Sequence, residues 1–313
     1  MKVLFHTNTL NYRGTAVAVT EYAKFNQDIL GNQSIICYNE TLTGNESNVV
    51  GNLKTQFQVV AHTDDNIQQV VNQTGCNVAY FIRAGNSGFV SDSCKTVVHS
   101  VFQLYEPHGD RYAYVSEWLA NHMNSQYNDT LPYVPHIVNL PAPNRDLRDQ
   151  LGILLGQTVI GRIGGYDTFD LPFVHRAIYT ILQQRSDFVF VMIGTRVFYE
   201  HPNIRYVPSV HNLQDKSNLI NACDAMIHAR SNGESFGLSI AEFLSQNKPV
   251  LAWNGGEDKN HLLMLKGSGT LYTEDTIAER LLNIRALDTQ DWATRVEQFS
   301  PIPAMNKFKE VFL

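Results

Sequence analysis

Short apolar runs alternate along almost the whole chain with segments whose apolar residues recur at helical spacing. Runs of this kind that are rich in β-branched and aromatic residues predict strands. In the first half of the chain the predicted strands are 2–7, 34–38, 57–62, 78–83, 96–99, 112–115 and 136–139. In the second half they are 158–163, 188–193, 204–207, 225–229, 249–253 and 270–272.

The helical patterns lie between many of these strands. The predicted helices include 15–30, 118–127, 171–184, 213–222 and 237–246, and a last amphipathic helix in "PIPAMNKFKEVFL", after a proline break. Such alternation favours parallel sheets that helices cover on both faces. The expected fold class is therefore α/β, with two Rossmann-like doubly wound domains.

The chain has 313 residues, a length that favours two domains. The stretch "NLPAPNRDLRDQLGILLG", 139–156, separates two series of strands and helices of similar size. We predict an N-terminal domain at 1–142, a linker at 143–156, a C-terminal domain at 157–298 and a helix at 299–313 that crosses back to the N-terminal domain. In open α/β sheets ligands bind outside the carboxyl ends of the strands, so a site is expected in the cleft between the domains.

Composition narrows the choice of partner and compartment. The net charge is −6, and no lysine- or arginine-rich run is present, which argues against a nucleic-acid polymer as the partner. The four cysteines, Cys37, Cys76, Cys94 and Cys223, are scattered and form no C-x-x-C pair, as in proteins of a reducing compartment. The sequence offers neither a signal peptide nor a membrane span, so a soluble, cytoplasmic protein is expected.

The stretch "NGESFGLSIAE", 232–242, carries the most informative chemistry. Glu234 and Glu242 stand eight positions apart, with Glu234 before a predicted helix and Glu242 inside it. On a helix eight residues span about 12 Å. That separation exceeds the roughly 5–9.5 Å of a glycosidase carboxylate pair, so the two acids are not expected to act as one.

A long ligand lying across the start of the helix fits this spacing. Backbone N–H groups of Phe236, Gly237 and Leu238 would face phosphate oxygens there, and Gly237 lets the backbone approach closely. The two acids would then hold hydroxyls at the two ends, a sugar and a ribose, which predicts a nucleotide-sugar. The structural alternative is an acid that complements the helix dipole, followed by an exposed mid-helix Glu.

At this point the chain resembles glycosyltransferase family 4, a group of retaining transferases with the two-domain GT-B fold. The resemblance rests on "ESFGLSIAE", followed by "KPVLAWNGG". It implies that Glu234 contacts the transferred sugar and that Glu242 binds the ribose. It also implies that the backbone from Phe236 to Leu238 lies on the phosphates, and Ser235 in the same turn is a further donor-binding candidate. The base would be held near Val207 to Ser209.

Other segments resemble the family in the same order along the chain. "VIGRIGGYD" places Arg162 on the diphosphate, and "TVVHSV" places His99 in the catalytic cleft. "YRGTAVAVTEYA" resembles the opening loop and helix, which places Gly14 and Thr15 near the phosphates. "YVSEWLANHM" and "VPHIVNLP" add further matches.

Two departures from the family pattern concern the phosphates. The lysine that follows the "GRL" strand of the family is missing, because residues 164–170 read "GGYDTFD". Arg162 would then act alone, or Arg196 or Arg230 would replace the lysine. The opening loop reads "RGT" instead of a double glycine. His6 and Arg83, at predicted strand ends, are further candidates for contacts with an acceptor.

The predicted function is retaining glycosyl transfer from a nucleotide-diphosphate sugar to a glycan, protein or small-molecule acceptor. No D-x-D pair occurs in the chain, so no metal and no other cofactor is expected. His99, Arg162 and Glu234 are the predicted catalytic residues. Two alternatives stay open: a nucleotide-sugar epimerase or hydrolase of the same fold, and a catalytically silent nucleotide- or glycan-binding protein.

Overall fold

The computed structural model describes residues 1–12, 14–287 and 290–313. It divides into two compact units. Unit 1 comprises Met1–Ile137 and Phe299–Leu313, and unit 2 comprises Val138–Gln298. In this division the predicted linker, 143–156, is part of unit 2.

Unit 1 contains a six-stranded parallel sheet in the order β3-β2-β1-β4-β5-β6. Its strands are β1 (Lys2–Thr7), β2 (Gln33–Asn39), β3 (Gln58–His62), β4 (Val78–Arg83), β5 (Lys95–Ser100) and β6 (Arg111–Tyr114). Four of them are buried over nearly their whole length, as expected for parallel strands covered on both faces.

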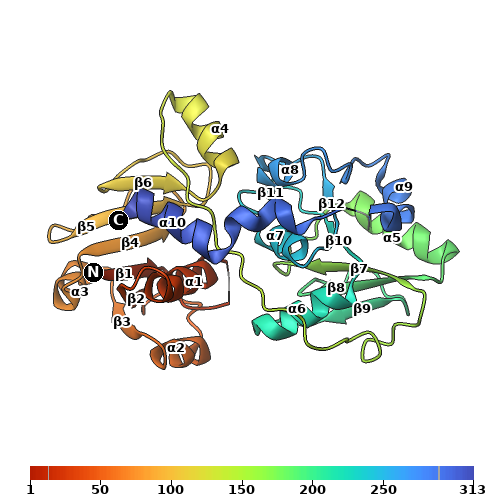
Figure 1. Cartoon of the computed structure of the whole chain (residues 1–313), viewed down its shortest axis with the longest axis horizontal. Helices are drawn as coiled ribbons and strands as arrows, with labels where there is room; N and C mark the ends of the chain where they lie inside the picture. Colours follow the sequence, from red (N-terminus) through yellow and green to blue (C-terminus); the bar gives the residue numbers. More distant parts are fainter. Residues whose placement is uncertain (13, 288–289) are drawn as a thin grey trace. The chain divides into compact units, whose positions relative to one another are not determined.

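The helices of unit 1 cover both faces of this sheet (Figure 1). They are α1 (Gly14–Asp28), α2 (Ser47–Lys54), α3 (Ile67–Thr74), α4 (Glu117–Tyr127) and the C-terminal α10 (Pro301–Phe312). On one face Phe5 and Tyr80 pack against Tyr22 of α1 and Phe308 of α10. On the other face alternate strand residues form a cluster with Val71 of α3.

Unit 2 repeats this plan with the sheet order β14-β12-β10-β7-β8-β9, again all parallel. The strands are β7 (Thr158–Ile163), β8 (Phe188–Ile193), β9 (Ile204–Val207), β10 (Ala225–His228), β12 (Val250–Trp253) and β14 (Leu271–Tyr272). A separate two-stranded sheet pairs β11 (Gly233–Glu234) with β13 (Asp258–Lys259).

The helices of unit 2 also lie on both faces of its sheet. They are α5 (Pro172–Gln184), α6 (Leu213–Ala222), α7 (Leu238–Ser245), α8 (Asn260–Met264) and α9 (Ile277–Leu282), followed by the 3-10 helices η1 (Ile284–Leu287) and η2 (Ala293–Phe299). Apolar residues of α5 and α9 form one core with the strands. Helix α7 contacts β10 and β12.

Both sheets have the Rossmann strand order 3-2-1-4-5-6, when the main strands of each unit are counted in chain order. The order reverses between β1 and β4 in unit 1, and between β7 and β10 in unit 2. We call the carboxyl ends of these strand pairs the switch points, where ligands of open α/β sheets bind. The predicted fold class, two Rossmann-like doubly wound sheets, is confirmed.

One predicted strand, 136–139, is wrong. The chain instead pairs with β6 slightly earlier, where Tyr133 forms a bridge with Tyr114 and the Val134 N–H donates to the Tyr114 carbonyl. Pro132 and Pro135 flank this pair and supply no N–H groups, so the pairing cannot extend into a full strand. Among the described residues, no helix combines the length and apolarity needed to cross a membrane.

Candidate functional site

Glu234 lies beside the switch point of unit 2, six residues after the end of β10. Its Oε1 accepts a hydrogen bond from His228 Nε2 at 3.2 Å, and its Oε2 accepts one from Arg230 at 3.1 Å. The side chain is 18% exposed. Each carboxylate oxygen can accept more than one hydrogen bond, so Glu234 can still accept a ligand hydroxyl.

The environment of Glu234 keeps it ionised. Burial by itself would raise the pKa of Glu234, but the His228 hydrogen bond and the charges of His228 and Arg230 outweigh it and lower the pKa. A paired carboxylate of this kind stays negative at neutral pH. The site therefore offers a fixed, charged acceptor.

Two contacts hold the loop that carries Glu234. The Ser231 N–H and hydroxyl both donate to Asp170, at 2.7 and 2.6 Å. Gly233 has a φ of +73°, and a Cβ there would lie 1.9 Å from the Asp258 carbonyl oxygen in the neighbouring strand β13. Glycine is therefore required at position 233, and the short sheet fixes the position of Glu234.

Helix α7 begins directly after this loop. Gly237 is its N-cap, has a φ of +92° and provides no side-chain cap. Because α-helix geometry leaves the first N–H groups without an intrahelical partner, the start of α7 suits an anion. Only Leu238–Ser245 is helical, so helix geometry alone does not give the separation between Glu234 and Glu242.

Glu242 lies inside α7 and forms its own ion pair. Lys216 Nζ of α6 donates to Glu242 Oε1 at 2.7 Å, and the two side chains are 14% and 7% exposed. Glu242 is thus a buried acid with a lysine partner, and not the exposed mid-helix Glu of the structural alternative.

Arg162 is the penultimate residue of β7, at the same switch point, and its guanidinium is hydrogen-bonded within the chain. One terminal nitrogen donates to Gly194 O and Thr195 Oγ1, and the other donates to Gly165 O and Thr168 Oγ1. Only 2% of the residue is exposed. Burial lowers the pKa of Arg162 to about 10, although Glu234 acts in the opposite direction. Arg162 remains a cation at neutral pH, and its contacts join the loops after β7 and β8.

The two arginines considered as replacements for the missing lysine differ. Arg230 is 30% exposed in its side chain, and its described hydrogen bond uses one terminal nitrogen, which leaves other donors of the guanidinium for a ligand. Arg196 is 70% exposed and pairs with Asp167. Arg230 therefore contacts Glu234, whereas Arg196 forms an exposed ion pair with Asp167.

His99 is a core residue of unit 1. It is fully buried against Phe312 of α10, and Tyr80 Oη lies 2.7 Å from its Nδ1. Its Nε2 lies 2.9 Å from the Val134 carbonyl, which can only accept, so Nε2 carries the proton and Nδ1 accepts from Tyr80. Burial lowers the pKa of His99 to about 4. Both ring nitrogens are therefore satisfied within the chain.

The switch point of unit 1 carries His6 on β1 and Arg83 on β4. His6 Nε2 lies 2.8 Å from His62 Nε2, and His62 Nδ1 lies 2.8 Å from the Thr63 carbonyl. In their neutral forms His62 donates to Thr63, and His6 donates to His62. His6 Nδ1 is then a buried acceptor without a hydrogen-bond partner among the described residues.

The remaining predicted residues lie at three places in the two units. Gly14 and Thr15 start α1 in unit 1, where Gly14 is exposed and a Cβ added to it would meet no other atom within 4 Å. Val207 ends β9, and its carbonyl accepts from the Gly194 N–H. The others lie in unit 2 at the turn into α7: Ser235, Phe236, Gly237 and Leu238.

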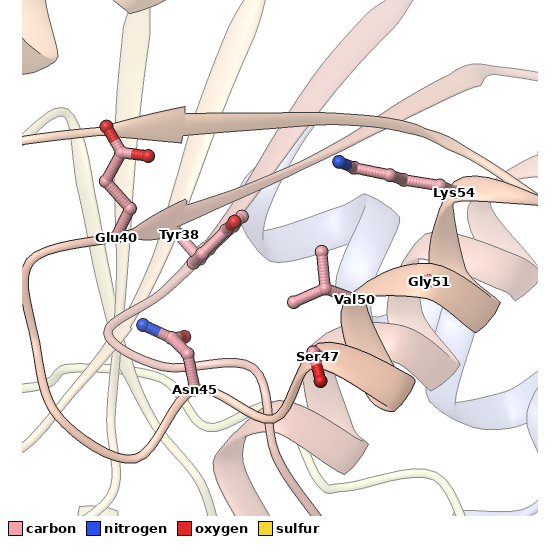
Figure 2. A pocket seen from close by; sticks show the side chains of 7 residues that line it. All are labelled: Tyr38, Glu40, Asn45, Ser47, Val50, Gly51 and Lys54. Atoms are coloured by element: carbon pink, nitrogen blue, oxygen red, sulfur yellow. The ribbon is translucent and has the colours of Figure 1, made fainter.

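Unit 1 also contains a pocket of about 380 Å³ between the end of β2 and α2 (Figure 2). Its lining residues are Tyr38, Glu40, Asn45, Ser47, Val50, Gly51 and Lys54. Glu40 and Lys54 form no salt bridge with any described residue. The pocket thus presents a carboxylate and an ammonium group separately.

Sequence reasoning missed three residues of the site in unit 2: His228, Lys216 and Asp170. His228 had a local signal, because it lies at the end of a buried strand and precedes Arg230 by two positions. Lys216 had none, since it meets Glu242 only through the packing of α6 and α7. Within the described ranges, His, Cys, Asp and Glu side chains nowhere gather in threes that could hold a metal ion.

No protein-family model matches the chain. No curated protein sequence matches it either. Solved structures do resemble it over nearly its full length. HepE from Anabaena, in complex with UDP and glucose, has a TM-score of 0.73 at 14% identity, covering 99% of this chain and 98% of that one. A glycosyltransferase from Rickettsia africae has a TM-score of 0.70 at 16% identity, covering 98% and 94%.

A third similar structure is a putative UDP-N-acetylglucosamine 2-epimerase from Listeria monocytogenes. Its TM-score is 0.64 at 11% identity, covering 98% of this chain and 94% of that one. The predicted GT-B fold is confirmed by these likenesses, and several of the similar structures are glycosyltransferases.

Proposed function

We propose that the chain is a glycosyltransferase that binds a nucleotide-diphosphate sugar at the switch point of unit 2. The observation that carries the proposal is Glu234, an ionised acid held by His228 and Arg230 directly before the uncapped start of α7. A sugar hydroxyl can donate to this carboxylate while the diphosphate lies at the helix start. HepE, similar in fold, has been crystallised with UDP-glucose and with UDP.

Arg230 is the proposed cation for the leaving diphosphate. Charge develops on the diphosphate as the glycosidic bond breaks, and a preorganised cation in a partly buried site stabilises it. The guanidinium of Arg230 has N–H donors beyond its described hydrogen bond, whereas both terminal nitrogens of Arg162 donate hydrogen bonds within the chain. We assign Arg162 a positioning role: it holds the loops after β7 and β8.

The nucleoside end of the donor is assigned to Glu242 and Val207. Glu242 would accept ribose hydroxyls, with Lys216 fixing its carboxylate at 2.7 Å. The backbone near Val207 would hold the base. Backbone contacts of this kind do not depend on side-chain identity, so the base itself is left to experiment.

The finer assignments follow the resemblance to glycosyltransferase family 4. We propose membership of that family, retention of anomeric configuration and transfer without a metal. His99 is assigned a positioning role in unit 1, because both of its nitrogens are bound within the chain. If EDTA abolished transfer and magnesium or manganese restored it, metal independence would be refuted.

The acceptor is proposed to bind to unit 1 through a polyhydroxylated group of a glycan or small molecule. The pocket at Tyr38, Glu40 and Lys54 supports this, because it offers an aromatic ring, an acceptor and a donor (Figure 2). Its volume of about 380 Å³ lies in the range of small-molecule sites. His6 and Arg83, at the switch point, are further candidates for acceptor contacts.

A nucleotide-sugar epimerase or hydrolase is the second candidate, favoured by the likeness to the putative epimerase from Listeria. Such an enzyme would turn over the donor without a sugar acceptor. A silent binder, the third possibility, would bind the nucleotide and release nothing.

One experiment separates these functions. A thermal-shift screen with UDP-, GDP-, ADP- and dTDP-sugars identifies the donor, since a ligand that binds the folded state stabilises it. Release of nucleoside diphosphate is then measured with and without a panel of glycan acceptors. Release that depends on an acceptor supports transfer, and acceptor-independent release supports the hydrolase. Conversion of the donor into its sugar epimer without release supports the epimerase, and binding with neither release nor conversion supports the silent binder.

A further inference from the structure

Two of the four cysteines, scattered in the sequence, come together in unit 1. Cys76 lies between α3 and β4, and Cys94 directly precedes β5. The parallel pairing of β4 with β5, with Val78 opposite Lys95, brings these two segments side by side. The two sulfur atoms lie 3.6 Å apart.

The two thiols of this pair have different environments. Cys76 is buried in the cluster with Phe81 and Val71, whereas Cys94 is half-buried and lies 3.5 Å from Ser91 Oγ. A hydrogen bond from Cys76, and a further one at Ser91, lower the pKa of Cys94. The thiolate is the reactive form of cysteine, so Cys94 is the more nucleophilic member of the pair.

The other two cysteines provide an internal contrast. Cys37 and Cys223 are fully buried, and burial raises the pKa of each thiol to about 12. Cys37 even belongs to the same apolar cluster as Cys76. Reactivity is therefore expected at the Cys76–Cys94 pair and not at thiols in general.

We propose that Cys76 and Cys94 form a peroxide-sensitive dithiol, in which Cys94 is oxidised first and Cys76 resolves it to a disulfide. A low-pKa, accessible thiol next to a second cysteine is the usual arrangement of oxidation-sensitive sites. The oxidant is a hydroperoxide. The site lies at the amino ends of β4 and β5, the opposite end of the sheet from the switch point.

The reaction balances with the two thiols and the hydroperoxide as the only reactants. The Cys94 sulfur attacks the terminal oxygen of the hydroperoxide, the O–O bond breaks, and the products are a sulfenic acid and an alcohol, or water from hydrogen peroxide. The Cys76 sulfur then attacks the sulfenic sulfur, the S–O bond breaks, and the hydroxide leaves with the Cys76 proton as water. The two thiols are oxidised by two electrons, and the peroxide is reduced.

The two sulfur atoms must move only a short distance to form a disulfide bond. A disulfide has an S–S distance of about 2.05 Å, so the sulfurs must approach by roughly 1.5 Å. Cys94 packs at the edge of the cluster, is half-buried and precedes its strand, so its side chain is the one expected to move. The bond would tie the end of α3 to the start of β5.

The test is mass spectrometry of the intact protein after treatment with hydrogen peroxide. The wild-type chain is expected to lose two hydrogen atoms, and peptide mapping is expected to link residue 76 to residue 94. In Cys76→Ala the sulfenic acid at Cys94 should persist and be trapped by dimedone. Cys94→Ala should give neither product, and Cys37→Ala and Cys223→Ala, the matched controls, should behave as the wild type.

A second measurement tests the reason for the reactivity. The rate of Cys94 alkylation by iodoacetamide at pH 7 should fall severalfold in Cys76→Ala, because loss of the Cys76 hydrogen bond raises the pKa of Cys94 and so lowers its thiolate fraction. A disulfide between other cysteines, dimedone labelling elsewhere, or an unchanged alkylation rate would overturn the proposal. Neither measurement requires a nucleotide-sugar, so the outcome does not depend on the proposed function.

Discussion

The two units share one strand order and therefore one kind of switch point, but the side chains there differ. In unit 2 the switch point brings together ionised groups: Arg162 and Glu234, with Arg230 in contact with the acid. In unit 1 it carries two imidazoles in direct contact, His6 and His62, beside the cation Arg83. The same backbone plan thus holds an ion-pair network in one unit and an imidazole pair in the other.

Burial explains why His6 is neutral. The pKa of His6 is lowered by burial first, and then by the charges of His62 and Arg83. Unit 2 instead buries Glu234 beside His228 and Arg230, which lower its pKa and keep it charged. The comparison indicates that the fold supplies the location of a ligand site, whereas the paired charges decide which ligand chemistry it suits. The charged groups of unit 2 are the ones proposed to bind the diphosphate and to stabilise the charge that develops on it.

The largest expected effect is at Glu234. Glu234→Gln removes the charge that Arg230 and His228 surround, and we expect kcat for glycosyl transfer to fall by about 10³-fold, in the range of lost transition-state contacts. Steady-state release of nucleoside diphosphate measures it. His6→Ala, the counterpart in unit 1, should leave the donor KM unchanged. If His6→Ala and Glu234→Gln lowered kcat equally, or raised the donor KM equally, the distinction between the two switch points would be refuted.

Arg230 comes next. Arg230→Met removes the cation proposed for the leaving group, and kcat should fall by about 10²-fold. Arg196→Met is the matched control, since that arginine is 70% exposed and its pair with Asp167 contributes little. If the two variants lost activity equally, or if Arg196→Met lost more, Arg230 would not be the replacement for the missing lysine.

Acid should destabilise the chain through its buried histidines. Burial lowers the pKa of His99 to about 4 and that of His136 to about 3, against about 6.5 in the unfolded chain. Below pH 6.5 the unfolded state takes up protons that the folded state excludes, so the free energy of unfolding decreases as the pH falls from 6.5 to about 4. Each histidine contributes a slope of about 1.4 kcal/mol per pH unit.

Urea titrations between pH 7.5 and 4.5 measure this slope. In His99→Gln the slope should decrease by the contribution of one histidine. A free energy of unfolding that stays constant between pH 6.5 and 5 would show that these imidazoles titrate normally.

The smallest effect is expected at Glu242. Glu242→Gln keeps an acceptor oxygen but loses the ion pair with Lys216, so we expect the donor KM to rise about fivefold, the value of one hydrogen bond, with kcat retained. Lys216→Met should act in the same direction. A fall in kcat with an unchanged KM would assign Glu242 to the chemistry and not to the ribose.

Much of the fold could be predicted because buried parallel strands are continuous apolar runs. The ranges 2–7, 78–83, 158–163, 188–193 and 204–207 agree with the observed strands at both ends. The strand at 136–139 was wrong because its apolar character suggested a strand, whereas the prolines on either side of 133–134 limit the pairing to a single bridge. The short sheet of β11 and β13 could not be found, since two-residue strands leave no periodic pattern.

Part of the candidate site could be proposed from the sequence. Glu234, Glu242 and Gly237 could be singled out because they lie in one short stretch with a helix start. The engagement of Arg162 with the loops after β7 and β8, and the contact of Cys76 with Cys94, depend on residues far apart in the sequence. Only the packing of the sheets brings such residues together.

Hydrogen–deuterium exchange in the presence of a nucleoside diphosphate tests the central claim most directly. The ligand is whichever of UDP, GDP, ADP and dTDP gives the largest thermal shift. The strongest protection is expected in peptides that cover 228–242, and not in those that cover 4–12 or 82–88, at the switch point of unit 1. Protection that is strongest in unit 1, or absent from 228–242, would contradict the account.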